Sequence, residues 1–262
     1  MKHSGPYQPR LVHEQPILYL PASGAVVTGR GLGPDWDMAV GATVTHVTPS
    51  SGFTTQFRRT RFTSAAAVAD QELGVHLPNA ADASIWRGNV DTGPNPDVYY
   101  GGFYFSTRFM VNAIPDTDVR FFAGLSNQVV GVCVSDTVAG HCVGLWCAST
   151  HATDLKLLTM DGTTATATDL TTDADLTAGT LYEFVMIGNP GGSSIVTQLL
   201  NVGLGTVLNE QNINTTMPSE TTFMAPQVGL SNAANVVGGD TSLDIISIYA
   251  RPRLRLAPEG LG

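Results

Sequence analysis

The sequence predicts an all-β protein folded as a two-sheet antiparallel sandwich, and three observations support that class. Charged residues make up 13% of the 262 positions, about half of the ~25% usual in soluble domains. The chain instead carries 30 threonines, 28 glycines and 15 prolines, a mixture of β-branched and turn-forming residues that favours many strands joined by loops. Period-two alternation of apolar side chains recurs along the chain, whereas helical periodicity is nearly absent.

The first 35 residues are predicted to form an extended arm outside the sandwich. Five of the fifteen prolines fall within the first 34 residues, which show no sustained apolar periodicity and have little to bury by themselves. Residues 36–262 are then expected to form one domain. Trp36, flanked by two aspartates, is interpreted as an assembly residue that pins the arm to the body or to a neighbour. The start of the chain lacks the apolar core of a secretory signal, so we expect synthesis in the cytoplasm.

Strands are expected wherever apolar side chains alternate with polar ones or run together. In chain order these segments are residues 40–45, 103–112, 120–125, 129–134, 142–148, 155–160, 182–187, 195–200 and 243–250. Asp161-Gly162, with apolar residues on both sides, predicts a hairpin turn. Residues 64–73 (SAAAVADQEL) are the one segment that predicts a short helix. No repeat of roughly 20–50 residues is visible, which argues against a solenoid or a propeller.

The charge pattern excludes several partners. The formal net charge is −9, and the two lysines are Lys2 and Lys156. Between Asp136 and Asp244, Lys156 faces eleven acidic side chains without another lysine or arginine, a composition that would repel a nucleic acid backbone. Neither lysine follows a glycine, so a P-loop is excluded. No window approaches ~20 consecutive apolar residues, so we expect no membrane insertion.

The cysteines are interpreted as small, reduced, buried side chains, because an odd number does not suit a disulfide framework. They are Cys133, Cys142 and Cys147. The sharpest metal alternative is zinc, held by His141, Cys142, Cys147 and His151. If residues 142–148 form a strand, the two cysteines point to opposite faces, and one tetrahedral ion cannot hold both without a sharp bend.

We expect no cofactor, with calcium as the alternative left open. Three Asp-x-Asp pairs place oxygen ligands in predicted loops, at Asp35 and Asp37, at Asp116 and Asp118, and at Asp173 and Asp175. None of the pairs stands in the twelve-residue pattern of an EF-hand. We interpret all three as solvated acidic turns and predict no metal site.

A series of short motifs resembles a group of bacteriophage virion and tail-associated proteins. The motifs are Trp86-Arg87-Gly88, Gly101-Gly102-Phe103, Arg108-Phe109, residues 120–126 (RFFAGLS), Val143-Gly144, residues 157–170, Tyr182-Glu183-Phe184 and residues 243–249. The resemblance implies a concanavalin A-like jelly roll, found in phage particles as a tail, fibre or surface component. It also implies a structural or host-recognition role and self-assembly, with a trimer favoured. The arm before Trp36 is not part of the pattern.

Two kinds of hydrolase are disfavoured by missing motifs. Jelly rolls of this type include glucanases, which use carboxylates in a Glu-x-Asp-x-x-Glu spacing along one strand. None of the six glutamates is followed at the second position by an aspartate. No Gly-x-Ser-x-Gly elbow occurs either, although a serine, a histidine and an aspartate distant in sequence can still meet in space. We therefore expect a protein that is not an enzyme, and a glycoside hydrolase remains the less favoured alternative.

A carbohydrate site is predicted in the loop of residues 86–100, because exposed aromatic rings stack on sugars and nearby polar groups bind hydroxyls. The candidate residues are Trp86, Arg87, Asn89, Asp91, Asn95, Asp97, Tyr99 and Tyr100. Trp86 has an equally simple interpretation as a core residue at a strand entrance. Trp146 is interpreted as a core residue as well.

The chain closes on three arginines at alternate positions, Arg251, Arg253 and Arg255, which share one side of an extended segment. They are read either as a solvated end or as an assembly surface that docks to an acidic neighbouring subunit. Together these interpretations predict a structural component of a phage particle that binds copies of itself, other virion proteins and host-surface glycans. The alternative is a lectin-like receptor-binding protein.

Overall fold

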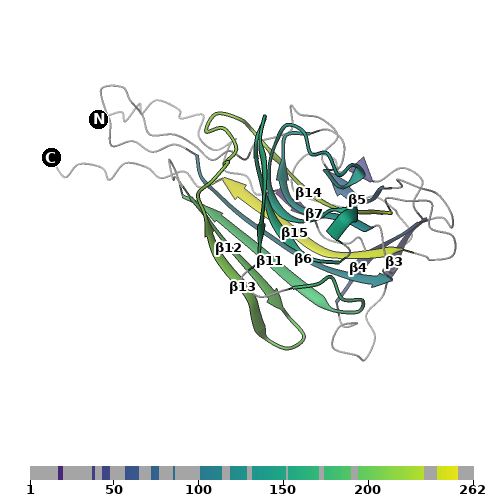
Figure 1. Ribbon diagram of the computed structural model, residues 1–262. Coiled ribbons are helices and arrows are strands. Elements are labelled where there is room, and N and C mark those ends of the chain that lie inside the picture. The colour runs from purple at the N-terminus through teal and green to yellow at the C-terminus, as the bar shows by residue number, and fades with distance from the viewer. Residues whose placement is uncertain are drawn as a thin grey trace, which may run out of the picture.

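A computed structural model of the chain shows a two-layered β structure in which long strands of one sheet cross behind a second, curved sheet (Figure 1). It describes residues 17–19, 37–38, 43–47, 57–64, 72–76, 85, 101–113, 119–128, 132–151, 153–170, 174–189, 194–232 and 241–252. Over these ranges the helical segments are two 3-10 turns, η4 (Val132–Val134) and η5 (Ser149–His151). The all-β prediction is confirmed.

The strands form two antiparallel sheets. The eight-stranded sheet runs in the order β13 (Thr206–Ile213), β12 (Ile195–Asn201), β11 (Leu181–Gly188), β6 (Phe103–Ala113), β15 (Ser242–Pro252), β4 (Arg59–Thr63) and β3 (Thr43–Val47), with β1 (Ile17–Tyr19) paired to β15. The seven-stranded sheet runs in the order β10 (Ala165–Asp169), β9 (Lys156–Asp161), β8 (His141–Cys147), β7 (Val119–Ser126), β14 (Ala225–Asn232), β5 (Glu72–His76) and β2 (Asp37–Met38). Each sheet joins a run of consecutive strands, β11 to β13 in one and β7 to β10 in the other, to strands distant in sequence, such as β15 beside β6 and β14 beside β7. The sandwich is therefore a jelly roll of the concanavalin A type.

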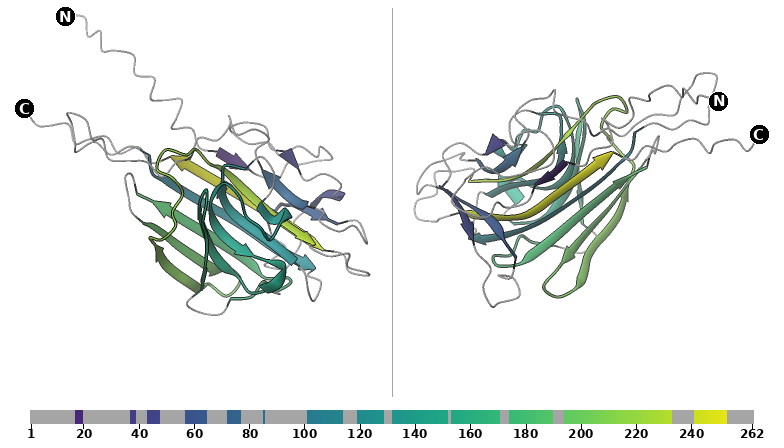
Figure 2. Two further views of the ribbon diagram at one scale, coloured as in Figure 1. Left: turned by 45° about the horizontal axis from the view of Figure 1, so that its top comes forward. Right: turned by 180° about the vertical axis from the view of Figure 1, so that it is seen from behind.

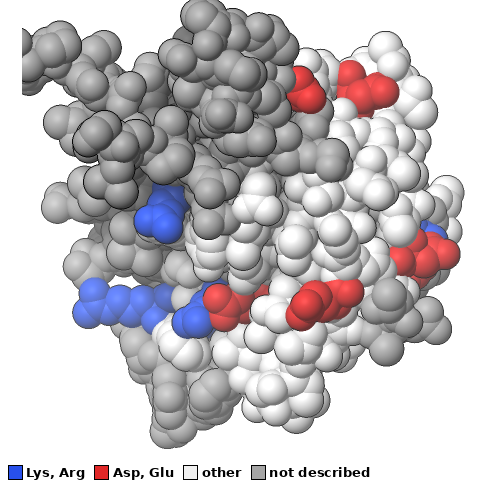
Figure 3. All heavy atoms as spheres, turned by 90° about the vertical axis from the view of Figure 1, so that its left-hand side faces the viewer, with Lys and Arg blue, Asp and Glu red and all other residues white. Residues whose placement is uncertain are grey.

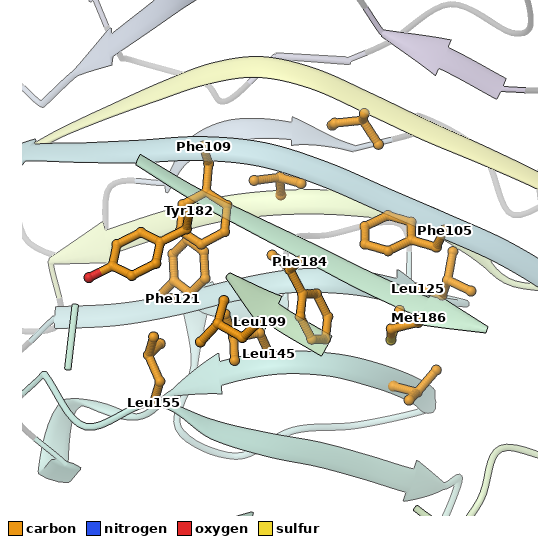
Figure 4. Close-up of a cluster of buried hydrophobic side chains, with 14 of the residues drawn as sticks. Phe105, Phe109, Phe121, Leu125, Leu145, Leu155, Tyr182, Phe184, Met186 and Leu199 are labelled. Atoms are coloured by element: carbon orange, nitrogen blue, oxygen red, sulfur yellow. The ribbon is translucent and has the colours of Figure 1, made fainter. Parts of the chain in front are cut away.

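The core lies between the two sheets and is rich in aromatic rings (Figure 4). Phe109 of β6 stacks on Tyr182 of β11 with ring centroids 5.4 Å apart and meets Phe121 of the opposite sheet at 4.7 Å. The buried Tyr182 hydroxyl donates to the Asp175 carbonyl at 2.8 Å, so its one polar atom is satisfied. Alternate residues of β6 face this core, as the period-two pattern predicts.

Most predicted strands are confirmed, and two local predictions are wrong. Residues 129–134 were expected as a strand, but Val132–Val134 form the turn η4. The helix predicted over residues 64–73 fails at its end, because Leu73 belongs to β5 and pairs with Leu230. Leu73 and Val75 are completely buried on alternate positions, so tertiary pairing outweighs the helical preference of the alanine-rich sequence before them.

The N-terminal arm reaches the body within the described residues. Ile17, Leu18 and Tyr19 pair with β15, beside the end of β4. The rest of residues 1–35 lies outside the described ranges, so the division into arm and body remains a prediction. Of the predicted assembly residues, Arg251 is exposed near the end of β15, whereas Trp36, Arg253 and Arg255 lie outside the described ranges.

The outer face of the seven-stranded sheet is covered by residues 127–128 and 132–140, which we call the covering loop. Gln227 on β14 accepts the Val132 N–H at 3.2 Å and donates to the Gln128 carbonyl at 2.7 Å. Ser231 of the same strand donates to the Cys133 carbonyl at 2.5 Å. A second cluster of buried apolar residues, which includes Trp146, fills the space beneath the loop. Trp146 is thus a buried residue, as predicted, although it lies outside the central core. The two views of Figure 2 show both sheets from other sides.

Candidate functional site

The loop predicted to bind carbohydrate lies outside the described residues. This holds for all eight candidates, namely Trp86, Arg87, Asn89, Asp91, Asn95, Asp97, Tyr99 and Tyr100. The nearest described positions are Ile85, which forms an isolated bridge with Met224, and Gly101 at the entrance to β6. The prediction for this loop therefore stands untested.

The zinc interpretation does not fit the geometry. Cys147 faces the central core, whereas Cys142 faces the second cluster beneath the covering loop, so the two thiols lie on opposite faces of the sheet. Burial raises the pKa of each thiol to about 12, which keeps both protonated near neutral pH and makes them poor ligands and nucleophiles. Among the described side chains, no group of three potential metal ligands gathers at one point.

Four polar residues meet at the end of the sandwich where strands β7, β8 and β9 begin or finish. They are Asn127, His141, Asp161 and Ser219, and we call them the His141 cluster. His141 opens β8 and pairs directly with Asp161, the last residue of β9. Ser219 comes from the connection between β13 and β14, which crosses from one sheet to the other at this end.

His141 is held by its neighbours through one bond to its imidazole and one to its backbone. Its Nδ1 accepts the Ser219 backbone N–H at 3.2 Å, and its own backbone N–H donates to Asn127 Oδ1 at 2.8 Å. A neutral imidazole that accepts at Nδ1 carries its proton on Nε2. His141 therefore presents an N–H donor, and no other described residue accepts a hydrogen bond from it.

Asp161 is fixed by its own turn. Its Oδ1 accepts the backbone N–H groups of Thr163 and Thr164 and the Thr163 hydroxyl, at 2.8 to 2.9 Å. These bonds hold the pKa of Asp161 below its ordinary value, and the largest contributions come from the backbone N–H groups of Thr164 and Thr163. All three of these hydrogen bonds use Oδ1, so Oδ2 is left as an acceptor of a carboxylate that is charged at neutral pH.

Two glycines with left-handed backbone make this arrangement possible. Gly162 has φ +96°, and a Cβ there would lie 2.8 Å from the His141 Nε2. Gly140 has φ +69°, and a Cβ would lie 2.4 Å from Asn127 Oδ1. Both positions demand glycine for backbone conformation and for space, and both border His141.

The cluster contains a serine, a histidine and an aspartate, but they are not connected as a nucleophilic triad. A triad needs an imidazole that donates from Nδ1 to the carboxylate and accepts the serine O–H at Nε2. Here Nδ1 accepts a backbone N–H of Ser219, while the Ser219 hydroxyl is shared with Thr221 at 3.3 Å. The site can donate and accept hydrogen bonds, and it cannot generate a serine alkoxide in this arrangement.

The segment of the chain that supplies His141, Asp161 and Ser219 is acidic. The segment from Asp136 to Asp244 has Lys156 as its single lysine or arginine, and the Lys156 Nζ is engaged by Asp169 at 2.5 Å and by Asp154 at 3.4 Å. On the face shown in Figure 3, most basic groups gather toward the left, while acidic groups are spread over the rest of the described surface.

Comparison with solved structures agrees with the jelly-roll fold. The chain is similar to a protein of unknown function from Shewanella oneidensis, with 10% sequence identity, a TM-score of 0.59, and 93% of this chain and 89% of that chain covered. It is also similar to arcelin-5, a lectin-like defence protein from Phaseolus vulgaris, with 8% identity, a TM-score of 0.54, and 93% and 100% covered. No protein-family model matches the sequence, and no curated protein matches it. At these identities the likeness establishes the fold, a lectin-type jelly roll.

The expectation that the chain is not an enzyme needs correction. Chains of similar architecture include a carbohydrate esterase of the Shiga toxin-encoding bacteriophage phi24B, with 12% identity, a TM-score of 0.45, and 84% and 90% covered. The expectation depended on two missing motifs, and their absence excludes only two chemistries. The fold itself does not separate binding proteins from enzymes.

Sequence reasoning found parts of the His141 cluster without joining them. Asp161 was predicted to open a hairpin turn, which is confirmed by β9 and β10, and His141 was considered as a zinc ligand. Ser219 and Asn127 stand in no motif. The four residues are as much as 92 positions apart (127 to 219), so only the pairing of strands brings them together.

Proposed function

We propose that this protein recognises carbohydrate through its lectin-type jelly roll. The observation that carries the proposal is the fold, which matches lectin-like arcelin-5 over the whole length of that chain. The composition agrees, because the chain has only 13 lysines and arginines and carries 30 threonines, whose hydroxyl groups suit hydrogen bonding to the neutral hydroxyl groups of a sugar.

The test is a glycan array probed with the full chain, followed by calorimetric titration of the best binders. We expect retention on a restricted set of glycans. Tyr99→Ala and Tyr100→Ala test the loop that the sequence predicts as the aromatic platform, and Tyr104→Ala is the matched control, since Tyr104 lies on the outer face of the eight-stranded sheet against Tyr249. Failure to bind any glycan at millimolar concentration would refute the proposal.

The same bound glycans also test for an enzyme. Each is incubated with the protein and analysed by mass spectrometry for loss of an acyl group or cleavage of a glycosidic bond. Turnover would make the protein a carbohydrate-active enzyme, whereas an unchanged glycan with saturable binding would make it a lectin.

We further propose that the protein is a component of a bacteriophage particle, at a tail, fibre or surface position, where it assembles with copies of itself and with other virion proteins. The ordered series of motifs described above supports this placement. Mass spectrometry of purified particles should detect the chain, and its absence from them would refute the placement.

The arm is proposed as the attachment segment, and the structure sharpens the deletion that tests it. Residues 17–19 pair with β15, so a deletion of residues 1–16 leaves that strand in place. We expect the shortened chain to fold with an unchanged melting temperature but to be lost from particles. Normal incorporation of the shortened chain would contradict this role for the arm.

A further inference from the structure

We propose that His141 and Asp161 form a subsite for two neighbouring hydroxyl groups of an uncharged sugar. The His141 Nε2–H donates to one hydroxyl oxygen, and Asp161 Oδ2 accepts the proton of the next hydroxyl. This inference rests on the proposed carbohydrate recognition and names a site for it that is separate from the loop of residues 86–100.

The first support is the complementary pair of unused hydrogen-bonding groups. His141 and Asp161 are directly opposed on β8 and β9, and side chains opposed in this way have Cβ atoms about 4.5–5.5 Å apart. One side chain presents a donor and the other a charged acceptor, and each is only partly buried. Among the described residues, neither the Nε2–H nor Oδ2 has a partner. A pair of adjacent hydroxyls offers the acceptor and the donor that these two groups require.

The second support is preorganisation. Bonds from Asn127 and Ser219 fix the position and the tautomer of His141, and three bonds within the turn fix Asp161. A recognition site whose groups are already oriented loses little conformational entropy when a ligand binds. The hairpin turn at Asp161 forms through its own hydrogen bonds and does not require that His141 be held in a fixed orientation beside it.

The third support is strain in the connection that supplies Ser219. Thr216, three residues earlier, has φ +47° and is the one described non-glycine residue with positive φ. A β-branched residue in this region is strained by about 1–3 kcal/mol and persists when its surroundings hold it. The Thr216 hydroxyl is bonded to Thr166 of β10 at 2.6 Å, and the neighbouring Thr215 carbonyl accepts the Thr159 hydroxyl at 3.0 Å. The fold thus maintains a costly backbone conformation in the connection that brings Ser219 to His141.

Charge selects the class of sugar. Asp161 is ionised throughout the neutral range, because its pKa lies below the ordinary value. The one lysine of the surrounding segment is occupied by two aspartates. A uronic or sialic acid would bring a second negative charge to this site without a cation to balance it, so it is repelled. The subsite therefore favours neutral hexoses over acidic sugars.

The decisive variant is Asp161→Asn. Its Oδ1 can still accept the turn bonds, while Nδ2 replaces the acceptor Oδ2 with a donor. We expect the affinity for the neutral glycan identified on the array to fall at least about tenfold, the size of a lost hydrogen bond to a charged group. Asp169→Asn is the matched control, because it removes the same charge at the other end of the hairpin, where Asp169 is mostly exposed, and it should bind like the wild type.

His141→Phe provides a second test, since the ring keeps its packing over Gly162 and loses the Nε2–H donor, together with the Nδ1 acceptor of the Ser219 N–H. Melting temperatures and near-UV circular dichroism establish that each variant is folded, and Asp161→Asn suffices if His141→Phe is not. Glycan binding that is unchanged in Asp161→Asn overturns the subsite and leaves the proposed function intact. Tighter binding of acidic than of neutral sugars overturns the selectivity. No glycan binding by the wild type refutes the proposed function itself.

Discussion

The outer faces of the two sheets differ in their exposure to solvent. On the seven-stranded sheet, the covering loop lies over β7 and β14, and the polar side chains beneath it, including Gln227 and Ser231, are buried and bonded to loop backbone. On the eight-stranded sheet, the outward residues of β6, β11 and β12 remain partly exposed, and Arg108 pairs with Glu183 at 2.9 Å in contact with solvent. The first face belongs to the interior of the protein, and the second is its surface.

The eight-stranded sheet also carries one charged residue that is shielded from solvent, since Asp244 of β15 is completely buried. Its two oxygens meet Arg59 at 2.5 Å and Arg61 at 2.7 Å. The same kind of ion pair therefore occurs twice on one face, once buried and once exposed. Because water screens exposed charges and leaves buried ones unscreened, substitutions at these positions should differ strongly in cost.

The largest effect is expected at the buried carboxylate. Asp244→Asn leaves the nearly buried Arg59 without a balancing charge, so the free energy of unfolding should fall by about 3–5 kcal/mol. Urea denaturation followed by fluorescence measures it. A loss below 1 kcal/mol would show that water reaches Arg59 in the folded protein.

The next effect concerns the covering loop. Gln227→Leu leaves the Val132 N–H and the Gln128 carbonyl without their partner, which should cost about 2 kcal/mol. Hydrogen exchange should accelerate at Val132 and its neighbours and remain unchanged in β11. The control is Gln198→Leu, because Gln198 bonds to Glu210 at an exposed position. Equal losses in the two variants would mean that the covering loop is not fastened by Gln227.

A smaller effect depends on pH. Burial alone would raise the pKa of Asp136, but hydrogen bonds from Arg120 and Ser149 outweigh it, and the pKa lies below the ordinary 3.8. The carboxylate therefore stabilises the fold fully above pH 3.8, and its contribution is lost as the pH falls below that value. Urea midpoints between pH 6 and pH 2 should drop less steeply in Asp136→Asn than in the wild type, and identical slopes would contradict this assignment.

The smallest effect is expected at the exposed pair. Glu183→Gln should change the free energy of unfolding by less than about 1 kcal/mol, and 1 M salt should remove the difference. A loss as large as that of Asp244→Asn would erase the distinction between the buried and the exposed pair.

The sequence predicted the framework of the sandwich because strands such as β6, β8 and β11 carry a clear apolar alternation. Strand β14 was missed, since its sequence contains Pro226 and Gly229 and lacks alternation. Its proline is tolerated because the pairing with β5 begins only at Val228, so no hydrogen bond to that neighbour is lost at Pro226. Strand β13 was missed because exposed edge residues carry little pattern.

The candidate site was less accessible to sequence reasoning. A turn such as Asp161-Gly162 is encoded by adjacent residues, and its hairpin could be predicted. The contact between His141 and Ser219 depends on where the connection between β13 and β14 crosses the end of the sandwich, and no local pattern encodes that path. In a catalytic triad the histidine donates from Nδ1, whereas His141 accepts a hydrogen bond there. Only the three-dimensional structure shows the direction of this bond.

Strand β15 imposes an order on how the chain can fold during synthesis. Arg61 has no Asp244 to pair with until 183 further residues have been made, and the edge of β6 that is not paired with β11 stays open until β15 has been made. At translation speeds of about 5–20 residues per second, this interval is roughly 10–40 s. During that time the eight-stranded sheet exists as two separate groups of strands with open edges. The nascent chain is thus exposed to mispairing and aggregation, and a chaperone that shields those edges should raise the yield of folded protein.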